Sequence, residues 1–158
     1  MSEVTITLPD NSTRIYDAGV TPLEVAESIG SRLAMDTVAA SVNGEFTDAS
    51  VPINEDSNLS LHTGSSVEGH EVLLHSTAHL MAQAVKALWP ESQVTIGPAI
   101  ENRFYYDFDI DGTFSDSDLL NIENKMREIT KENLTVTRQE ISRNKAIKLF
   151  KNMGENYK

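Results

Sequence analysis

Two short strands joined by a tight turn open the chain, and the segments that follow them leave few folds available. Residues 4–8 alternate apolar and polar side chains and are rich in β-branched residues, a pattern that predicts a half-buried strand. Residues 9–12 (Pro-Asp-Asn-Ser) form a turn cluster, and residues 13–16 read as a second strand. The chain therefore begins with a predicted β-hairpin.

One capped helix and a further hairpin signal complete this first pattern. Residues 21–33 open with Thr-Pro-Leu-Glu, which provides an N-cap, a proline at the first helical position and a capping box. Residues 38–42 predict a strand, residues 43–44 (Asn-Gly) a two-residue turn, and residues 59–61 a strand that closes a small sheet. The order ββαβββ predicts a ubiquitin-like β-grasp domain over residues 1–63.

A second pattern begins after residues 64–66 (Gly-Ser-Ser), which we interpret as a short linker. Its most regular helix covers residues 71–89 and ends before Pro90. The rest alternates helices and strands, so residues 67–158 predict a second α+β unit, and the fold class of the chain is α+β. The further elements are expected as strands over 94–96, 104–106 and 134–137, and as helices over 116–132 and from Ser142 to Gly154.

Composition excludes several classes of protein. The 158 residues contain no cysteine, so disulfide scaffolds, cysteine-based zinc fingers and thiol nucleophiles are impossible within this sequence. No apolar run reaches the roughly 18 residues that a membrane helix needs, and the first residues lack a signal-peptide pattern, so we expect a cytoplasmic protein without membrane partners. The net charge of −11 argues against bulk polyanion binding, yet residues 125–158 are basic.

The predicted helix over 71–89 carries the sharpest local signal for chemistry. His75 and His79 are one helical turn apart and project from the side opposite the apolar stripe. Such a pair can face solvent, relay protons without a metal, or bind a metal together with His62, His70 or a carboxylate. Small residues at 78 and 82 are expected to leave room for an approaching group.

The order of motifs along the chain resembles one family. Residues 6–10 (Ile-Thr-Leu-Pro-Asp), 29–34 and 42–45 (Val-Asn-Gly-Glu) are similar to a TGS domain. The second unit resembles the editing domain of bacterial-type threonyl-tRNA synthetases. The motifs that carry this second resemblance are His-Ser-Thr-Ala-His-Leu over 75–80, Ala-Val-Lys-Ala-Leu-Trp-Pro over 84–90, Ile-Gly-Pro-Ala-Ile over 96–100, Phe-Tyr-Tyr-Asp over 104–107 and Gly-Glu-Asn-Tyr-Lys over 154–158.

The resemblance implies an enzyme much longer than this chain, which charges tRNA with threonine using ATP. Residues 1–63 would be its TGS domain, residues 64–66 a linker and residues 67–158 the first part of an editing domain that hydrolyses mischarged seryl-tRNA. The chain is then expected to be an N-terminal fragment, inactive by itself and possessing no cofactor. ATP, Mg²⁺ and Zn²⁺ would belong to the missing catalytic domain, the acceptor end of tRNA(Thr) would be the partner, and the whole enzyme would be a homodimer, with the fragment a monomer.

The resemblance also implies the residues of an incomplete editing site. His75 and His79 match its histidine helix, Tyr106 matches its tyrosine and Lys158 its lysine. A cysteine, a later histidine and an aspartate of that site have no counterpart in this sequence. As a chain end, Lys158 is expected to be frayed, and Tyr106 could equally be a half-buried strand aromatic.

Two other functions stay open on the sequence. The β-grasp unit could be an RNA- or protein-binding module with the remainder as scaffold, or His75 and His79 could belong to a metal hydrolase. The acidic first unit disfavours tight RNA binding by that unit alone. Five cations of the basic segment could instead contact a tRNA acceptor arm, namely Arg138, Arg143, Lys145, Lys148 and Lys151.

Overall fold

A computed structural model describes residues 2–158. The chain divides into two compact units, the first ending at Leu73 and the second covering Leu74–Lys158, and each is described by itself. The boundary falls inside helix α3 (Val67–Leu88), after the seventh residue of that helix. None of the helices within residues 2–158 combines the length and the hydropathy that a membrane crossing requires.

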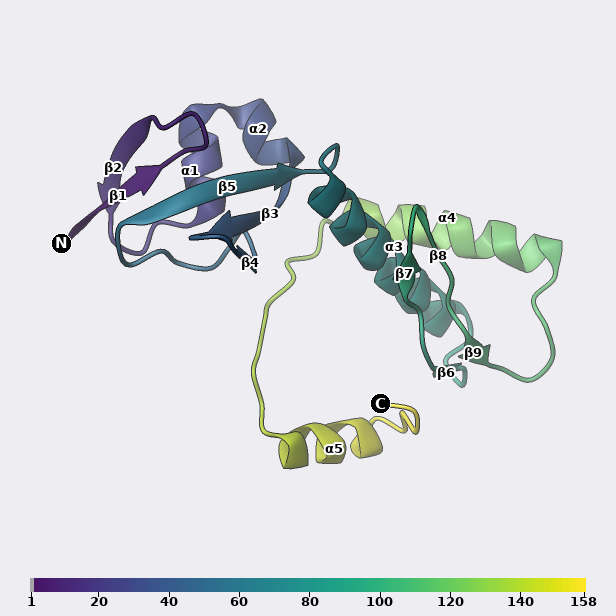
Figure 1. The fold of residues 1–158 in the computed structure, drawn as a ribbon. Coiled ribbons are helices and arrows are strands. Elements are labelled where there is room, and N and C mark those ends of the chain that lie inside the picture. Colours follow the sequence, from purple (N-terminus) through teal and green to yellow (C-terminus); the bar gives the residue numbers. More distant parts are fainter. Residues whose placement is uncertain (1) are drawn as a thin grey trace. The chain divides into compact units, whose positions relative to one another are not determined.

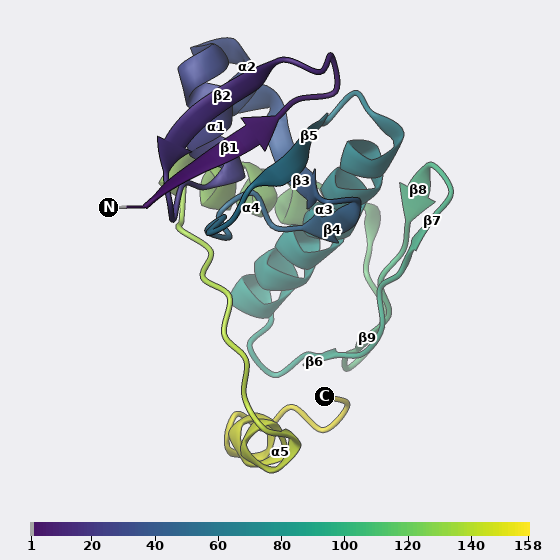
Figure 2. The same cartoon turned by 60° about the vertical axis from the view of Figure 1, so that its left-hand side comes forward.

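The first unit is a five-stranded mixed sheet covered on one face by two helices (Figures 1 and 2). The strand order is β2-β1-β5-β3-β4, and every neighbouring pair is antiparallel except β1 with β5. This confirms the predicted β-grasp arrangement. In chain order the elements are β1 (Glu3–Thr7), β2 (Thr13–Asp17), α1 (Pro22–Ile29), α2 (Ser31–Asp36), β3 (Thr37–Val42), β4 (Glu45–Thr47) and β5 (Ser57–Thr63).

The core of the first unit lies between α1 and the sheet. Val25 of α1 is fully buried with Ile6 of β1 and Leu59 of β5. The predicted capping box forms: the Glu24 backbone N–H donates to the Thr21 hydroxyl (3.2 Å), and the Thr21 N–H donates to the Glu24 carboxylate (2.7 Å). Because the capping box fixes where α1 begins, it also fixes which side chains of α1 face the sheet.

The expected single helix over 21–33 is wrong in one respect, because Gly30 divides it. Gly30 has extended backbone (φ 173°, ψ 139°), so α1 ends there and α2 begins at Ser31. Its N–H still donates to the Ala26 carbonyl (2.9 Å), and its own carbonyl accepts from the Ala34 N–H (3.1 Å). Glycine stabilises a helix poorly, and here it serves both helix ends at once.

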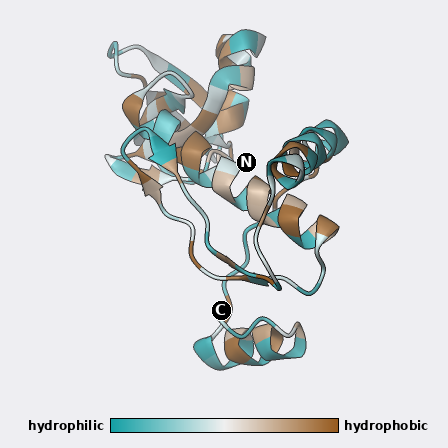
Figure 3. Ribbon diagram, turned by 90° about the vertical axis from the view of Figure 1, so that its right-hand side faces the viewer, coloured by the Kyte–Doolittle hydropathy of each residue, from teal (hydrophilic) through white to brown (hydrophobic). Residues whose placement is uncertain are grey.

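The second unit packs α3 against α4 (Asp116–Glu132) beside two short two-stranded ribbons. Ala84 and Val85 of α3 are fully buried with Ile122 and Ile129 of α4, and Trp89 lies at the margin of this cluster. In Figure 3 hydrophobic and hydrophilic residues alternate around α4, as expected for a helix with one buried face. The remaining elements are β6 (Gln93–Val94), β7 (Ala99–Ile100), β8 (Arg103–Phe104), β9 (Phe108–Asp109) and α5 (Arg143–Asn152).

One predicted strand is absent from the second unit. Residues 134–137 alternate like a strand but have no strand neighbour within residues 2–158, and Val136 is 92% exposed. A strand exists through hydrogen bonds to an adjacent strand, which a local alternation pattern cannot supply. The helices on either side form: Ser115 caps α4, and Gly154 follows α5 in the left-handed region (φ 74°). Ser142 precedes α5 as expected, but its side chain makes no capping hydrogen bond.

Candidate functional site

Helix α3 places the two predicted histidines side by side. The ring centroids of His75 and His79 are 4.3 Å apart, with an edge-to-face angle of 60° between the rings, and both residues are exposed. This is the geometry expected for side chains one turn apart on a helix. The two imidazoles are therefore outside the apolar core of the unit, as the sequence predicts.

The small residues beside the histidines do not leave the open space expected from the sequence. Ala78 is fully buried and Ala82 is 8% exposed, so their methyl groups pack inside the protein. The boundary between core and surface passes directly beside the histidine row. Imidazoles at such a boundary meet solvent on one side and apolar groups on the other.

Partial burial lowers the pKa of His79 below the ordinary histidine value of 6.5. Desolvation is the largest cause, followed by the positive charges of His75 and Lys158. The lowered pKa favours the neutral ring near pH 7, and a neutral imidazole can accept a proton from water. Geometry and electrostatics thus both allow His79 to act as a base.

We expect His79 to titrate below pH 6.5 in the folded chain and close to 6.5 when the chain is unfolded in urea. Because the unfolded chain then binds more protons than the folded one, His79 favours the folded state fully above about pH 6.5. That contribution is lost as the pH falls through the pKa of the folded state. NMR titration of the imidazole protons in both states measures the difference, and equal values would contradict it.

Lys158 is held in place rather than frayed. Its Nζ donates to the Thr95 carbonyl (2.9 Å) and lies 5.9 Å from the centroid of the Tyr106 ring, within cation–π range. Figure 2 shows the end of the chain close to β6, the strand that Thr95 follows. The expectation of a frayed end fails because long-range contacts fix the last residues.

Tyr106 lies in the irregular segment between β8 and β9, so the expected strand over 104–106 does not include it. Its ring stacks on Phe108, with centroids 5.0 Å apart, and rests directly against the Gly97 backbone. A Cβ atom at position 97 would overlap the Tyr106 ring, so only glycine permits this approach. The half-buried ring forms a wall beside the Lys158 ammonium.

The structure brings all four predicted site residues into one unit. His75 adjoins His79, the Lys158 charge acts on His79, and Lys158 lies beside Tyr106. Such a cluster can orient a water molecule, accept its proton and offer a cation to developing negative charge. Within residues 2–158 no three His, Asp or Glu side chains come together as a metal site. The metal interpretation would therefore need a ligand beyond this pair.

Sequence reasoning did not find the residues that hold Lys158. The last four residues contact Lys86, Gln93, Asp109 and Thr95, none of which the motif analysis selected as a site residue. One signal was available, because Lys86 continues the helical row of His75 and His79. A lysine in line with a histidine pair indicates that all three side chains lie on one face of the helix. It does not indicate that Glu155 is the partner of this lysine.

Comparison with known proteins agrees with the fold and the motifs. Residues 4–63 match the family model of the TGS domain. The whole chain is 49% identical to a threonine--tRNA ligase of Citrifermentans bemidjiense over 158 residues, which are 25% of that protein. It is 50% identical over 155 residues to that of Herminiimonas arsenicoxydans and 52% over 153 residues to that of Saccharophagus degradans, in each case 24% of the relative's length.

These matches define the class of protein: the chain contains a TGS domain, and its relatives are aminoacyl-tRNA synthetases. Within that class its relatives are the threonine--tRNA ligases, so the predicted resemblance to the threonyl-tRNA synthetase family is confirmed. The chain spans about a quarter of the length of these relatives.

Proposed function

We propose that this chain is the proofreading part of a threonine--tRNA ligase and contributes to the hydrolysis of mischarged seryl-tRNA(Thr). The observation that carries the proposal is the cluster of His75, His79, Tyr106 and Lys158 in a chain about half identical to such ligases. The whole enzyme would attach threonine to its tRNA with ATP and Mg²⁺, and a Zn²⁺ would belong to its aminoacylation domain. None of these cofactors is assigned to residues 1–158.

The physical need for proofreading follows from the size of the two amino acids. Serine lacks one methyl group of threonine, and a single methylene-sized difference gives only about 1–3 kcal/mol of discrimination. A synthetic site that accepts threonine therefore also admits some serine. A second, hydrolytic site can admit the smaller product and exclude the larger one sterically. That site must hold the ester, position water and stabilise the oxyanion.

The geometry of the cluster supports a role for each residue. His79, neutral near pH 7, accepts a proton from the attacking water, and His75 orients the same water or the ester. The Lys158 ammonium is the cation available to stabilise the oxyanion, and Tyr106 shapes the pocket beside it. We infer that the site is incomplete, because the cysteine of the resembled site has no counterpart here, and that the chain is inactive by itself.

The tRNA partner fits the charge of the last part of the chain. The four cations of α5 are all exposed, and α5 contains no acidic residue. Exposed lysine and arginine side chains neutralise phosphates and release counterions. We propose that α5 faces the acceptor end of the tRNA, and that the whole enzyme is a cytoplasmic homodimer that does not bind membranes. The cations are Arg143, Lys145, Lys148 and Lys151.

The function is tested with a synthetase that contains this sequence. Seryl-tRNA(Thr) should be hydrolysed much faster than threonyl-tRNA(Thr), because the extra methyl group is excluded from the second site. Release of labelled amino acid from each charged tRNA measures the two rates. Equal hydrolysis of both, or of neither, would overturn the proposal. The separate 158-residue chain should release no serine above the uncatalysed rate.

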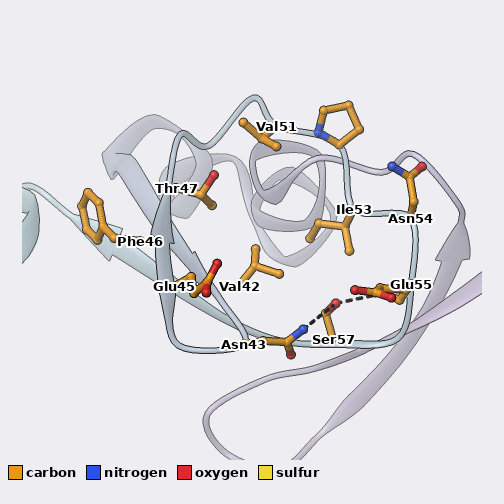
Figure 4. A pocket seen from close by; sticks show the side chains of 11 residues that line it. Val42, Asn43, Glu45, Phe46, Thr47, Val51, Ile53, Asn54, Glu55 and Ser57 are labelled. Carbon is orange, nitrogen blue, oxygen red and sulfur yellow. Dashed lines mark hydrogen bonds between the residues drawn. The ribbon is translucent and has the colours of Figure 1, made fainter.

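A binding function for the first unit is the second candidate, and one pocket favours it. A hollow of about 590 Å³ lies between β4 and the segment before β5, with Val42 and Ile53 at its floor (Figure 4). Glu45 and Glu55 line it together with the exposed ring of Phe46, and no lysine or arginine does. This lining suits a protein segment with apolar and basic side chains better than RNA phosphates.

A further inference from the structure

Each of the last four residues of the chain makes a side-chain or backbone contact with a distant part of the second unit. Four side-chain contacts join this segment to α3 or to the region of β6 and β9, which form one antiparallel ribbon. The contacts are Glu155 Oε1 with Lys86 Nζ (2.8 Å), the Asn156 N–H with Gln93 Oε1 (3.1 Å), the Tyr157 hydroxyl with Asp109 Oδ2 (3.0 Å) and Lys158 Nζ with the Thr95 carbonyl (2.9 Å).

Among these four contacts the Lys86–Glu155 ion pair is the least exposed, because it joins a buried carboxylate to a half-buried lysine. Glu155 is 9% exposed, whereas Asn156, Tyr157 and Lys158 are exposed. Exposed pairs and hydrogen bonds contribute little because water competes for the same groups. Glu155 Oε2 is buried without a hydrogen-bond partner within residues 2–158, so Lys86 provides the compensation for this carboxylate. The ion pair therefore determines where the segment attaches.

Lys86 is itself fixed on three sides. Its ammonium donates to the Pro90 carbonyl (3.0 Å) and the Ser92 carbonyl (2.8 Å), besides its contact with Glu155. These three acceptors match the three donors of an ammonium group. A lysine held by two backbone carbonyls and one carboxylate cannot move without breaking the turn that follows α3. Glu155 is thus bound to a rigid point.

The same helical face carries this anchor and the histidine pair. Lys86 lies seven residues after His79, close to two full turns, which corresponds to about 10 Å along the helix axis. Only two residues separate Glu155 from Lys158, whose positive charge acts on His79. The last turn of α3 therefore holds Glu155 through Lys86, and a position two turns earlier presents the imidazole on which the Lys158 charge acts.

We propose that Lys86 and Glu155 are positioning residues of the proofreading site, whose ion pair sets the place of the Lys158 ammonium against the Tyr106 ring and the Thr95 carbonyl. This inference rests on the proposed function for its consequence in catalysis. The positioning itself is a property of the chain and can be measured without any reaction.

The first test is the NMR titration of His79 in the 158-residue chain. Glu155→Gln removes a negative charge, which by electrostatics alone lowers the pKa of His79. Release of the Lys158 ammonium has the opposite sign, because it removes a positive charge from the neighbourhood of His79. We expect the pKa of His79 to rise in Glu155→Gln, in the same direction as in Lys158→Met. A fall or no change in a folded variant would overturn the positioning role.

Two further variants keep the test decisive if Glu155→Gln does not fold. Glu155→Asp keeps the charge but shortens the side chain by one methylene, so a rise in the pKa of His79 again reports displacement of Lys158. Tyr157→Phe removes one exposed hydrogen bond to Asp109 and is the matched control, with no change expected. Equal titration of His79 in Glu155→Asp and in the unchanged chain would contradict the proposal.

The second test uses hydrolysis of seryl-tRNA(Thr) by a synthetase that contains this sequence. Misplacing a reacting group by about 1 Å can cost about 10²-fold in rate, so Glu155→Gln should lower kcat to the level of Lys158→Met. The double variant should be no slower than either single one. If Lys158→Met abolishes hydrolysis while Glu155→Gln does not, the positioning role fails. If Glu155→Gln displaces Lys158 in the titration and neither variant slows hydrolysis, the positioning stands and the proposed function fails.

Discussion

His75→Ala and His79→Ala should each slow the hydrolysis of seryl-tRNA(Thr) by about 10²–10⁴-fold, the usual contribution of a general acid or base. The rings lie 4.3 Å apart and act together in the proposed site, so the double variant should be little slower than the more damaging single one. Attachment of threonine to tRNA should be unchanged, because under the proposed function that reaction takes place in a separate aminoacylation domain. Serine release from charged tRNA and the threonylation rate are the two measurements.

His70→Ala is the matched control for these variants. It removes the same ring from the same helix, at an exposed position outside the histidine pair. Hydrolysis should remain at the level of the unchanged enzyme. Wild-type hydrolysis in both His75→Ala and His79→Ala would sink the assignment of the site, whereas loss in all three variants would indicate general damage to α3.

Ile6→Ala should lower the free energy of unfolding of the first unit by about 2–5 kcal/mol, the range for deleting a buried isoleucine side chain. Ile6 is fully buried in β1, where it packs with Val25 of α1 and Leu59 of β5. A single core of this size rarely supplies more than about 3–5 kcal/mol of stability. The substitution should therefore leave much of the β-grasp domain unfolded, as followed by urea titration of the amide signals of β1 and β5.

Ile15→Ala is the control on the neighbouring strand. Ile15 pairs with Thr5 across the β1–β2 ladder and is 66% exposed. The same chemical change at this surface position should alter the free energy of unfolding by no more than about 0.5 kcal/mol. Comparable losses in both variants would mean that the strand, and not the core, determines the stability of the unit.

Local signals predicted most of the fold because they act over a few residues. Ser115 caps α4 as expected, with its N–H donating to the Asp118 carboxylate (2.8 Å). The Asn-Gly turn at 43–44 joins β3 and β4, both residues having positive φ. The predicted strand over 134–137 failed for the converse reason. Its alternation pattern is correct for a strand, but pairing requires a neighbouring edge that no local pattern can reveal.

The candidate site likewise contains residues that local spacing places and residues that only long-range contacts place. The spacing of His75 and His79 fixes their geometry as soon as the helix is predicted, so sequence alone placed them together. Lys158 and Tyr106 came from resemblance to a family, because their proximity depends on contacts between distant residues. The hydrogen bond from Lys158 to Thr95 spans 63 positions in the sequence. Such contacts are set by packing of the whole unit, and the ion pair of Lys86 with Glu155 belongs with them.

The close approach of Gly97 to the Tyr106 ring couples two positions that are nine residues apart. No side chain fits at position 97 while an aromatic ring occupies this place, so the two residues can change only together. Among related sequences, a larger residue at 97 should accompany the loss of the aromatic side chain at 106. A substitution at position 97 would therefore displace the Tyr106 ring without altering its hydroxyl group.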